Sequence, residues 1–199
     1  MTTTFFLVRH GAHPLLGHVL AGRMPGVSLN QEGRDQSRRL AAGLARRGVT
    51  SLQSSPRERA RETAAPIAER CGVPLEIAPA LDEVDMGAWT GRAFSDLKLD
   101  PGWGRWNALR SIARPPGGER LIEVQSRVTD HLDRVRHERP DSSVVIVSHG
   151  DVIKAAILYY LGLSLDACER IEVDVASLSA LLIGDWGAKL ISLNEPVSA

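Results

Sequence analysis

Two hydrophobic patterns alternate along the chain. Runs of consecutive apolar residues occur at 4–8 and within 143–150, and weaker runs occur at 50–55 and 75–78. Between these runs, apolar residues recur three and four positions apart, which is the spacing of one helix face. The clearest such face comprises Leu121, Val124, Val128, Leu132 and Val135. The pattern therefore predicts strands and helices in alternation.

Capping and turn residues set the expected boundaries of these elements. Asn30 is expected to cap a helix that runs to about Arg47. Ser55 and Pro56 are expected to start a second helix, as its N-cap and first residue, and Gly72 to end it. The remaining expected elements are a short helix at 94–99 in the otherwise irregular segment 79–117, a helix at 151–161, and strands near 171–175, 178–183 and 188–193.

The alternation of strands and helices defines the fold class. Strands that are apolar throughout are typical of a parallel sheet with helices on both faces, because both sets of side chains are then buried. We therefore expect an α/β protein, a three-layer α/β/α sandwich with a mainly parallel central sheet. The chain of 199 residues shows no repeat, linker or low-complexity segment, so we expect a single domain, 1–199.

Charged side chains stand at the ends of three predicted strands. Arg9 and His10 end the first strand, and His149 ends the last long apolar strand. The second strand leads into a helix whose first turn carries Arg57 and Arg59. Ligands of such sheets bind outside the carboxyl ends of the strands, where helix N-termini also attract anions. Because guanidinium groups bind phosphate oxygens by paired hydrogen bonds, this cluster predicts a phosphate site.

Composition and charge narrow the class of partner. Lys plus Arg and Asp plus Glu both number 24, and a net charge of zero is unusual for a nucleic-acid-binding protein. Cys71 and Cys168 have no metal-ligand spacing, which argues against a disulfide framework or a zinc site. No apolar run is long enough to span a membrane, and the N-terminal run ends at Arg9 without signal-peptide features. We expect a cytoplasmic protein without nucleic-acid or membrane partners, and the sequence leaves the oligomeric state open.

Five motifs occur in order over most of the chain. They are LVRHG (7–11), GVSLNQEGRDQS (26–37), SSPRERARETA (54–64), LDEVDMGAWTG (81–91) and VIVSHG (145–150). Together they resemble the motifs of the histidine phosphatases, also called the phosphoglycerate-mutase-like superfamily, in its small bacterial-type phosphatase branch. The resemblance implies a phosphoglycerate-mutase-like fold and a small phosphorylated substrate.

The resemblance also implies how phosphate would be bound and attacked. His10 would attack phosphorus and become a phosphohistidine. The groups that would hold the phosphoryl oxygens and stabilise the transition-state charge are Arg9, Arg59 and His149. The motif places the second arginine at Arg59 and not at Arg57. Because arginine and histidine supply the positive charge, we expect neither a metal nor another cofactor.

The proton donor is expected in the stretch LDEVD. The resemblance favours Glu83 as the acid that protonates the leaving oxygen and later activates water, with Asp85 as the fallback. A partly buried position would suit this acid by raising its pKa. Trp89 is expected to pack against the acid loop, and Gly22 and Arg23 are candidate substrate-binding residues.

The loop after the nucleophile motif departs from the mutases of this superfamily. Those proteins follow RHG with Glu and then a Trp-Asn pair, whereas this chain has Ala12, His13, Pro14, Leu15 and Leu16. The chain is also shorter than those mutases. These differences favour a metal-independent phosphomonoesterase. The alternatives are a cofactor-dependent phosphoglycerate mutase and a non-catalytic phosphate-ester binding protein. A protein that only binds the ester would have no use for an acid such as Glu83.

Two irregular segments, 12–26 and 92–117, are expected to form a lid. The second carries arginines that either reach a second anionic group of the substrate or are ordinary surface charge: Arg105, Arg110 and Arg114. Asp151 is expected to stabilise the N-terminus of its helix. His13 and His18 are expected to be structural or exposed, because the motifs do not support a metal cluster that includes them.

Overall fold

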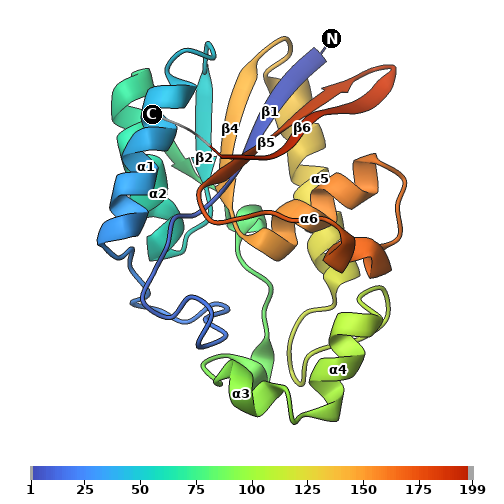
Figure 1. Cartoon of the computed structure of the whole chain (residues 1–199). Helices are drawn as coiled ribbons and strands as arrows, with labels where there is room; N and C mark the ends of the chain where they lie inside the picture. The colour runs from blue at the N-terminus through green and yellow to red at the C-terminus, as the bar shows by residue number, and fades with distance from the viewer. Residues whose placement is uncertain (1, 197–199) are drawn as a thin grey trace.

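One mixed sheet forms the centre of the protein, whose computed structural model describes residues 2–196 (Figure 1). Its strands lie in the order β3-β2-β4-β1-β5-β6. The four strands β1 to β4 pair in parallel, and β5 and β6 are added antiparallel. The strands are β1 (Thr2–Arg9), β2 (Ser51–Ser54), β3 (Leu75–Ile77), β4 (Ser143–Ser148), β5 (Ser177–Gly184) and β6 (Gly187–Pro196). The expected α/β class with a mainly parallel sheet is confirmed.

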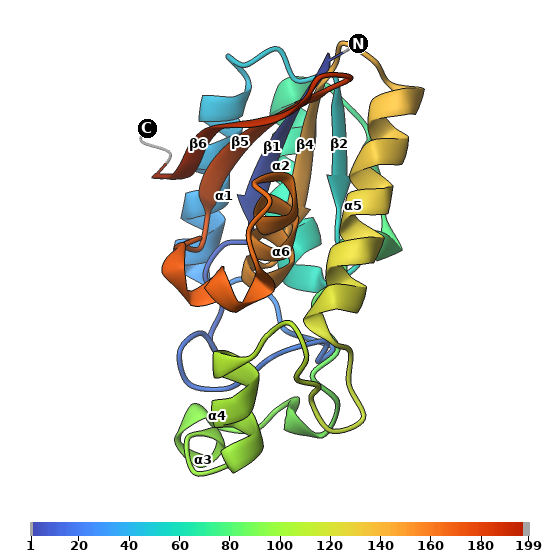
Figure 2. The ribbon, with the colours of Figure 1, turned by 90° about the vertical axis from the view of Figure 1, so that its right-hand side faces the viewer.

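Helices cover both faces of this sheet (Figure 2). One face carries α1 (Gln31–Leu44) and α2 (Glu58–Cys71), and the opposite face carries α5 (Leu121–Glu138) and α6 (Gly150–Tyr160). All five apolar residues of the predicted face of α5 are buried. Among the helices in residues 2–196, none has the length and apolar character required to cross a membrane.

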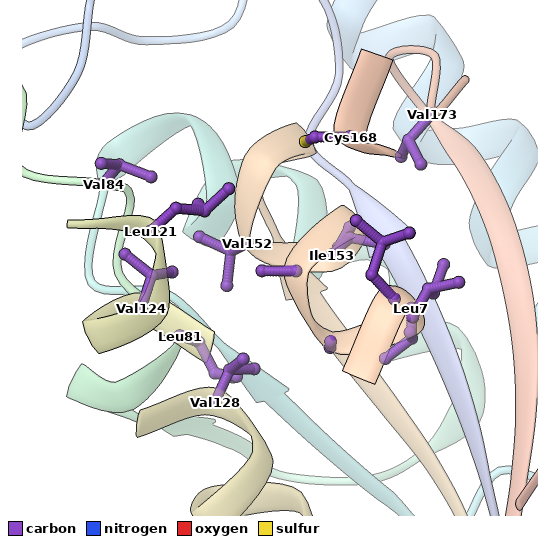
Figure 3. Close-up of a cluster of buried hydrophobic side chains, with 14 of the residues drawn as sticks. Leu7, Leu81, Val84, Leu121, Val124, Val128, Val152, Ile153, Cys168 and Val173 are labelled. Carbon is purple, nitrogen blue, oxygen red and sulfur yellow. The ribbon is translucent and has the colours of Figure 1, made fainter. Parts of the chain in front are cut away.

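The two covered faces explain why β1 is apolar throughout. Phe5 and Leu7 point to the core under α5 and α6, whereas Phe6 and Val8 point to the core under α1 and α2. Figure 3 shows part of the first core, in which Leu7 lies beside Ile153 of α6. Burial of apolar surface on both faces provides the main driving force for folding.

The pairing of β1 with β4 brings two motif histidines to one edge of the sheet. The parallel register aligns Arg9 with Ser148, and the His10 N–H donates to the Ser148 carbonyl at 3.0 Å. His10 and His149 therefore leave neighbouring strands side by side. β2 pairs with the other side of β4 and leads into α2, which carries Arg59 to the same edge.

The predicted cap of α1 is confirmed. Asn30 Oδ1 accepts a hydrogen bond from the Gly33 N–H at 2.8 Å, which pairs one of the free donors of the first turn. The helix ends at Leu44 and not near Arg47.

The predicted start of α2 is wrong. The helix begins at Glu58 with Arg57 in the N-cap position, and Ser55 and Pro56 precede it. The Ser55 hydroxyl accepts from the Arg57 N–H at 3.3 Å, and it also lies 2.8 Å from Nε2 of His149, a partner from another strand.

The predicted strand near 171–175 is wrong as well. This segment follows a 3-10 helix, Leu165–Arg170, and is irregular. Its backbone groups bond to side chains: the Val173 carbonyl accepts from Arg9 Nη1 at 2.7 Å, and the Asp174 N–H donates to Asn194 Oδ1 at 2.7 Å. The strands expected at 178–183 and 188–193 are confirmed as β5 and β6.

Two segments, 12–26 and 92–117, lie beyond the carboxyl edge of the parallel strands, in the lower part of Figure 1. An antiparallel bridge between Val19 and Ala93 joins them. The second segment contains α3 (Phe94–Leu97), which matches the helix expected at 94–99.

A further helix, α4 (Pro101–Ala108), lies where irregular structure was expected. Asp100 caps it, because its Oδ1 accepts from the Gly102 N–H at 2.9 Å, and Pro101 occupies the first turn. Trp89 is 2% exposed and donates its indole N–H to Asp100 Oδ2 at 3.1 Å, so it is buried next to the N-terminus of α4.

Candidate active site

His10 is held as a neutral imidazole at the end of β1. Its Nδ1 lies 2.9 Å from the Gly11 carbonyl, which can only accept, so Nδ1 carries the proton. Nε2 is then unprotonated and accepts from Arg59 Nε at 3.2 Å. Burial and the Arg59 charge lower the pKa of His10 well below its ordinary value. His10 therefore presents a lone pair to its surroundings at neutral pH.

Gly11 lets the loop after His10 pass close to α1. A Cβ at this position would lie 2.7 Å from the backbone oxygen of Gly33, closer than side-chain carbons approach backbone. The Gly11 N–H donates to the hydroxyl of Thr63 in α2 at 3.0 Å. Both helices on this face thus fix the backbone beside His10.

Arg59 connects the two histidines from the first turn of α2. Its side chain is 1% exposed, and its Nη2 lies 3.1 Å from His149 Nδ1 and 2.9 Å from the Gly22 carbonyl. Arg57 does not share this position: it forms two hydrogen bonds of 2.8 Å with the Asp82 carboxylate. Arg57 therefore holds the loop before Glu83.

His149 is fully buried at the end of β4. With Arg59 donating to Nδ1, the Nε2 proton is donated to Ser55 Oγ at 2.8 Å. Burial, Arg59 and His10 lower the pKa of His149 well below its ordinary value. The rings of His10 and His149 lie 5.2 Å apart. Ser55 is a site residue that its sequence context, typical of a helix cap, did not reveal.

Three buried nitrogen atoms around His10 have no hydrogen-bond partner within residues 2–196. They are Arg9 Nε, Arg59 Nη1 and His13 Nδ1. Buried polar groups are nearly always paired, and clustered positive charges are unfavourable without a counter-charge. An anion with several acceptor oxygens, such as a phosphoryl group, fits these donors.

Glu83 lies beside this cluster on the loop after β3. Its Oε2 is 3.5 Å from His149 Nδ1 and 3.9 Å from Arg59 Nη2. Burial, followed by the nearby Asp151 charge, raises the pKa of Glu83 to about 7. An acid with this pKa is poised to give and take protons near neutral pH.

Asp85 does not occupy a comparable position. Its side chain is 44% exposed, and its Oδ1 accepts from the Gly87 N–H at 2.9 Å. It is absent from the cavity that Glu83 lines. The geometry therefore favours Glu83 over Asp85 as the group that faces a ligand.

A cavity of about 360 Å³ opens over His10. Its polar wall contains Arg9, His10, His13, Arg59 and Glu83. Apolar residues of the segments 12–26 and 92–117 also line it: Leu16, Val19, Leu20, Ala21 and Phe94. His149 does not line it and acts through its contacts with Arg59 and Glu83. Within residues 2–196, no three His, Cys, Asp or Glu side chains are grouped so that they could hold a metal ion.

His13 belongs to this site, although its sequence context predicted a structural or exposed residue. It is 6% exposed, and its ring lies 5.4 Å from that of His10. Burial, Arg59 and Arg9 lower the pKa of His13 to about 4, so the ring is neutral at pH 7. A histidine in an irregular loop carries no local signal of its position, which explains why sequence did not reveal it.

The two candidate substrate-binding residues differ in position. Gly22 lines the cavity. Arg23 does not: its Nη2 pairs with Glu119 at 2.9 Å, and its Nε donates to the Glu83 carbonyl at 2.7 Å. Arg23 therefore fixes the backbone of the acid loop.

Arg110 is neither surface charge nor a free anion-binding group. It is 5% exposed and pairs with Asp151 at 2.9 Å and Glu169 at 2.7 Å. Burial alone would raise the pKa of Asp151, but the Arg110 charge holds it below its ordinary value. Asp151 lies in the first turn of α6, the position that its predicted role at the helix N-terminus requires. Its charge also raises the pKa of Glu83. Arg114 is likewise paired, with Glu123 at 2.6 Å.

Comparison with known proteins identifies the class that this fold and site define. The family model of the histidine phosphatase superfamily, branch 1, matches residues 5–196. The chain belongs to this superfamily.

Relatives and solved structures include phosphatases and a mutase. Phosphoserine phosphatase 1 of Hydrogenobacter thermophilus is 29% identical over 178 residues, covering 87% of this chain and 84% of the relative. A probable phosphoglycerate mutase, GpmB of Serratia proteamaculans, is 32% identical over 179 residues, covering 87% and 82%. The native structure of mycobacterial glucosyl-3-phosphoglycerate phosphatase, Rv2419c, has a TM-score of 0.88 at 25% identity, covering 98% of this chain and 99% of that one. The family and these neighbours support a phosphatase or mutase enzyme.

Proposed function

We propose that the protein is a metal-independent phosphomonoesterase that forms a phosphohistidine on His10. The observation that carries the proposal is the state of His10. Its Nδ1 proton is held by the Gly11 carbonyl, and its unprotonated Nε2 accepts a hydrogen bond from Arg59, for which a phosphoryl oxygen can replace it as the acceptor. A neutral, oriented nitrogen beside cationic donors is suited to attack an anionic phosphate ester.

The reaction proceeds in two balanced steps. First, the Nε2 lone pair of His10 forms a bond to phosphorus, the bond from phosphorus to the leaving oxygen breaks, and that oxygen takes the proton of Glu83. Next, water attacks phosphorus and gives a proton to the Glu83 carboxylate as the N–P bond breaks. Inorganic phosphate leaves, and both side chains return to their starting states. In both steps the phosphoryl oxygens are held by Arg9 and Arg59, and His149 keeps Arg59 in place through its Nδ1.

The raised pKa of Glu83 supports a catalyst over a phosphate-ester binding protein. A group that only binds a dianion gains nothing from a neighbouring carboxyl group, which repels the ligand once ionised. The loop after His10 supports a phosphatase over a phosphoglycerate mutase. It places Leu16 and Leu20 in the cavity wall, and the phosphate-binding asparagine of the mutases is missing from 12–16.

We propose one histidine phosphatase domain over residues 1–199 that acts in the cytoplasm on a small phosphorylated substrate. The segments 12–26 and 92–117 form its lid, supported by the bridge between Val19 and Ala93 and by the presence of Phe94 in the cavity wall.

The purified protein is expected to hydrolyse phosphate monoesters without added metal and to keep full activity in EDTA. Phosphate release is measured on a panel of esters, with a zinc-dependent phosphatase treated in parallel to verify that chelation is effective. Loss of activity in EDTA that a divalent cation restores would contradict the metal-free mechanism. Transfer of the phosphoryl group to an added alcohol or sugar phosphate, with little release to water, would favour the mutase instead.

His13→Ala is expected to raise KM for phosphate esters by ~10-fold or more, because a hydrogen bond to a charged group is typically worth about 1.5–3 kcal/mol. The neutral imidazole donates one hydrogen bond to a phosphoryl oxygen in this account. The matched control is His18→Ala, which removes an exposed histidine of the same loop. Equal KM values for the two variants in steady-state assays would remove His13 from the phosphate site.

A further inference from the structure

The carboxyl group of Glu83 is held in place by its own backbone. Among residues 2–196, its one hydrogen bond is the one that Oε1 accepts from the Val84 N–H at 2.9 Å. Its contacts with His149 and Arg59 are longer, at 3.5 Å and 3.9 Å. The direction of this carboxyl group therefore depends on the orientation of the peptide group between Glu83 and Val84.

Two arginines hold the other end of that peptide group. The Glu83 carbonyl accepts from Arg23 Nε at 2.7 Å and from Arg127 Nη2 at 3.2 Å. Because a peptide group is planar, fixing its carbonyl also fixes the N–H of Val84. The arginines therefore orient the hydrogen bond that holds the Glu83 carboxyl group, although neither of them lines the cavity over His10.

Glu119, which directly precedes Arg120 and α5, joins the two arginines. Its Oε2 accepts from Arg23 Nη2 at 2.9 Å, and its two carboxylate oxygens accept from Arg127 Nε and Nη2 at 2.9 Å and 3.1 Å. The contact with Arg127 is bidentate, which fixes the plane of the guanidinium group as well as its position. The Glu119 side chain is 17% exposed, so water screens these interactions only in part.

Charge explains why the two arginines need this carboxylate. Both donate to one carbonyl oxygen, so their guanidinium groups lie close together and repel each other. Asp82 is paired with Arg57 by two hydrogen bonds of 2.8 Å, and Asp85 is 3.8 Å from Arg23. In the described part of the chain, Glu119 alone forms ion pairs with both arginines.

We propose that Glu119 is a positioning residue for the acid. Through the two arginines it fixes the peptide group after Glu83, and that peptide group directs the carboxyl group towards the leaving oxygen. The inference rests on the proposed phosphatase function and concerns how the same site places its proton donor. Glu119 does not line the cavity over His10, so its effect passes through Glu83.

The first test is the leaving-group dependence of Glu119→Gln, in which a side chain of the same size lacks the charge that holds both arginines. The first step with an alkyl phosphate should slow by ~10–100-fold, because misplacement of a catalytic group has costs of this order. The same step with 4-nitrophenyl phosphate should change little, since it depends less on the acid. An equal loss on both esters, or no loss on either, would overturn the inference.

Two further variants accompany this test. Glu123→Gln is the matched control, because Glu123 pairs with Arg114 and Arg120 and has no contact with the acid loop. Both rates should stay unchanged in it. Arg127→Lys keeps the positive charge but not the bidentate contact, so it should show the same selective loss as Glu119→Gln. It provides the reading if Glu119→Gln does not fold.

A double variant shows whether the effect passes through Glu83. If Glu119 acts by placing this acid, adding Glu119→Gln to Glu83→Gln should slow the alkyl ester no further. A general loss of structure would instead combine with the loss of the acid. A further ~10-fold decrease in the double variant would therefore contradict the positioning role. Thermal melting verifies that each variant folds.

A titration of Glu83 separates failure of this inference from failure of the proposed function. Carbon-13 NMR follows its carboxyl group without substrate. Burial raises the pKa of Glu83 to about 7, and a carboxyl group that is no longer directed into the site should titrate closer to its ordinary value. Both Glu119→Gln and Arg127→Lys should show this decrease. The charged and titratable groups that surround Glu83 are the same in all these proteins: Arg9, His10, Arg59, His149, Asp151 and Lys154.

Each result of the titration has one interpretation. A decrease in both variants supports the positioning role, even if the unmodified protein hydrolyses no ester and the phosphatase proposal fails. An unchanged pKa in both variants would overturn the inference and leave the phosphatase intact. A decrease in Glu119→Gln without one in Arg127→Lys would reflect the lost charge alone and would also overturn it.

Discussion

Replacing His10 by Ala should reduce hydrolysis of 4-nitrophenyl phosphate by ~10⁴-fold or more, since loss of a covalent nucleophile removes the reaction path itself. Arg9, Arg59 and Glu83 remain in this variant, but none of them supplies the uncharged nitrogen that attacks phosphorus. Steady-state assays of phosphate release measure the effect. Circular dichroism and thermal melting verify that the variant folds.

His18→Ala is the matched control for this experiment. It removes a histidine from the same part of the chain, but one that is exposed and outside the cavity. Its activity should stay close to that of the unmodified protein. Turnover by folded His10→Ala at a near-normal rate would exclude the phosphohistidine mechanism.

Glu83→Gln should slow alkyl phosphates by ~10²–10⁴-fold in the first step, the usual contribution of a positioned general acid. An alkoxide is a poor leaving group and needs the proton, whereas 4-nitrophenolate needs it much less. The aryl ester should therefore lose less rate than the alkyl ester. Single-turnover rapid quench isolates formation of the phosphohistidine from its hydrolysis, in which Glu83 acts as the base.

The pH dependence of the first step tests the role of Glu83 as the acid independently. Because the acid must be protonated and the pKa of Glu83 is raised to about 7, the first step with an alkyl ester should slow as the pH rises through about 7. In Glu83→Gln the rate of the first step should not show this decrease. Ionisation of the substrate phosphate near pH 6 affects both proteins equally and cancels in the comparison.

Asp85→Asn is the control for the acid assignment. The Asp85 side chain is about half exposed and accepts from the Gly87 N–H outside the cavity, so Asp85→Asn should leave the leaving-group dependence unchanged. A selective loss on alkyl esters in Asp85→Asn, with none in Glu83→Gln, would move the acid to Asp85.

Much of the site could be predicted because it lies at strand ends. Apolar runs locate β1 and β4, and the chain that follows each run must leave the sheet at its carboxyl edge. Arg9, His10 and His149 could therefore be placed together before the strand order was known. The Asn30 cap was predictable for a similar reason, since it bonds to Gly33 within the same turn.

The features that sequence did not predict depend on partners far away in the chain. Ser55 resembles a helix cap locally, but its hydroxyl meets His149 from another strand. Arg110 resembles surface charge in an irregular segment, yet it is buried, and its ion pairs with Asp151 and Glu169 offset the cost of burying its charge. Hydrophobic periodicity does not predict such pairings, because they depend on how the segment 92–117 packs against α6.

The helix α4 was not predicted for a different reason, namely that its local sequence signals conflict. The pair Asp100 and Pro101 is a local start signal for a helix, but the short segment after it contains two glycines, Gly102 and Gly104, which oppose helix formation. Packing of Trp106, which is fully buried, stabilises a helix that propensity alone would not.

The most direct test of the central claim is to trap the enzyme during turnover and locate its phosphoryl group. Rapid quench under alkaline conditions, followed by mass spectrometry of intact protein and peptides, should reveal one added phosphoryl group on the peptide that contains His10. The modification should be lost in acid, as expected for an N–P bond, and should be absent from His10→Ala. A phosphoryl group on a different residue, or single-turnover release of phosphate without any phosphorylated enzyme, would contradict the account.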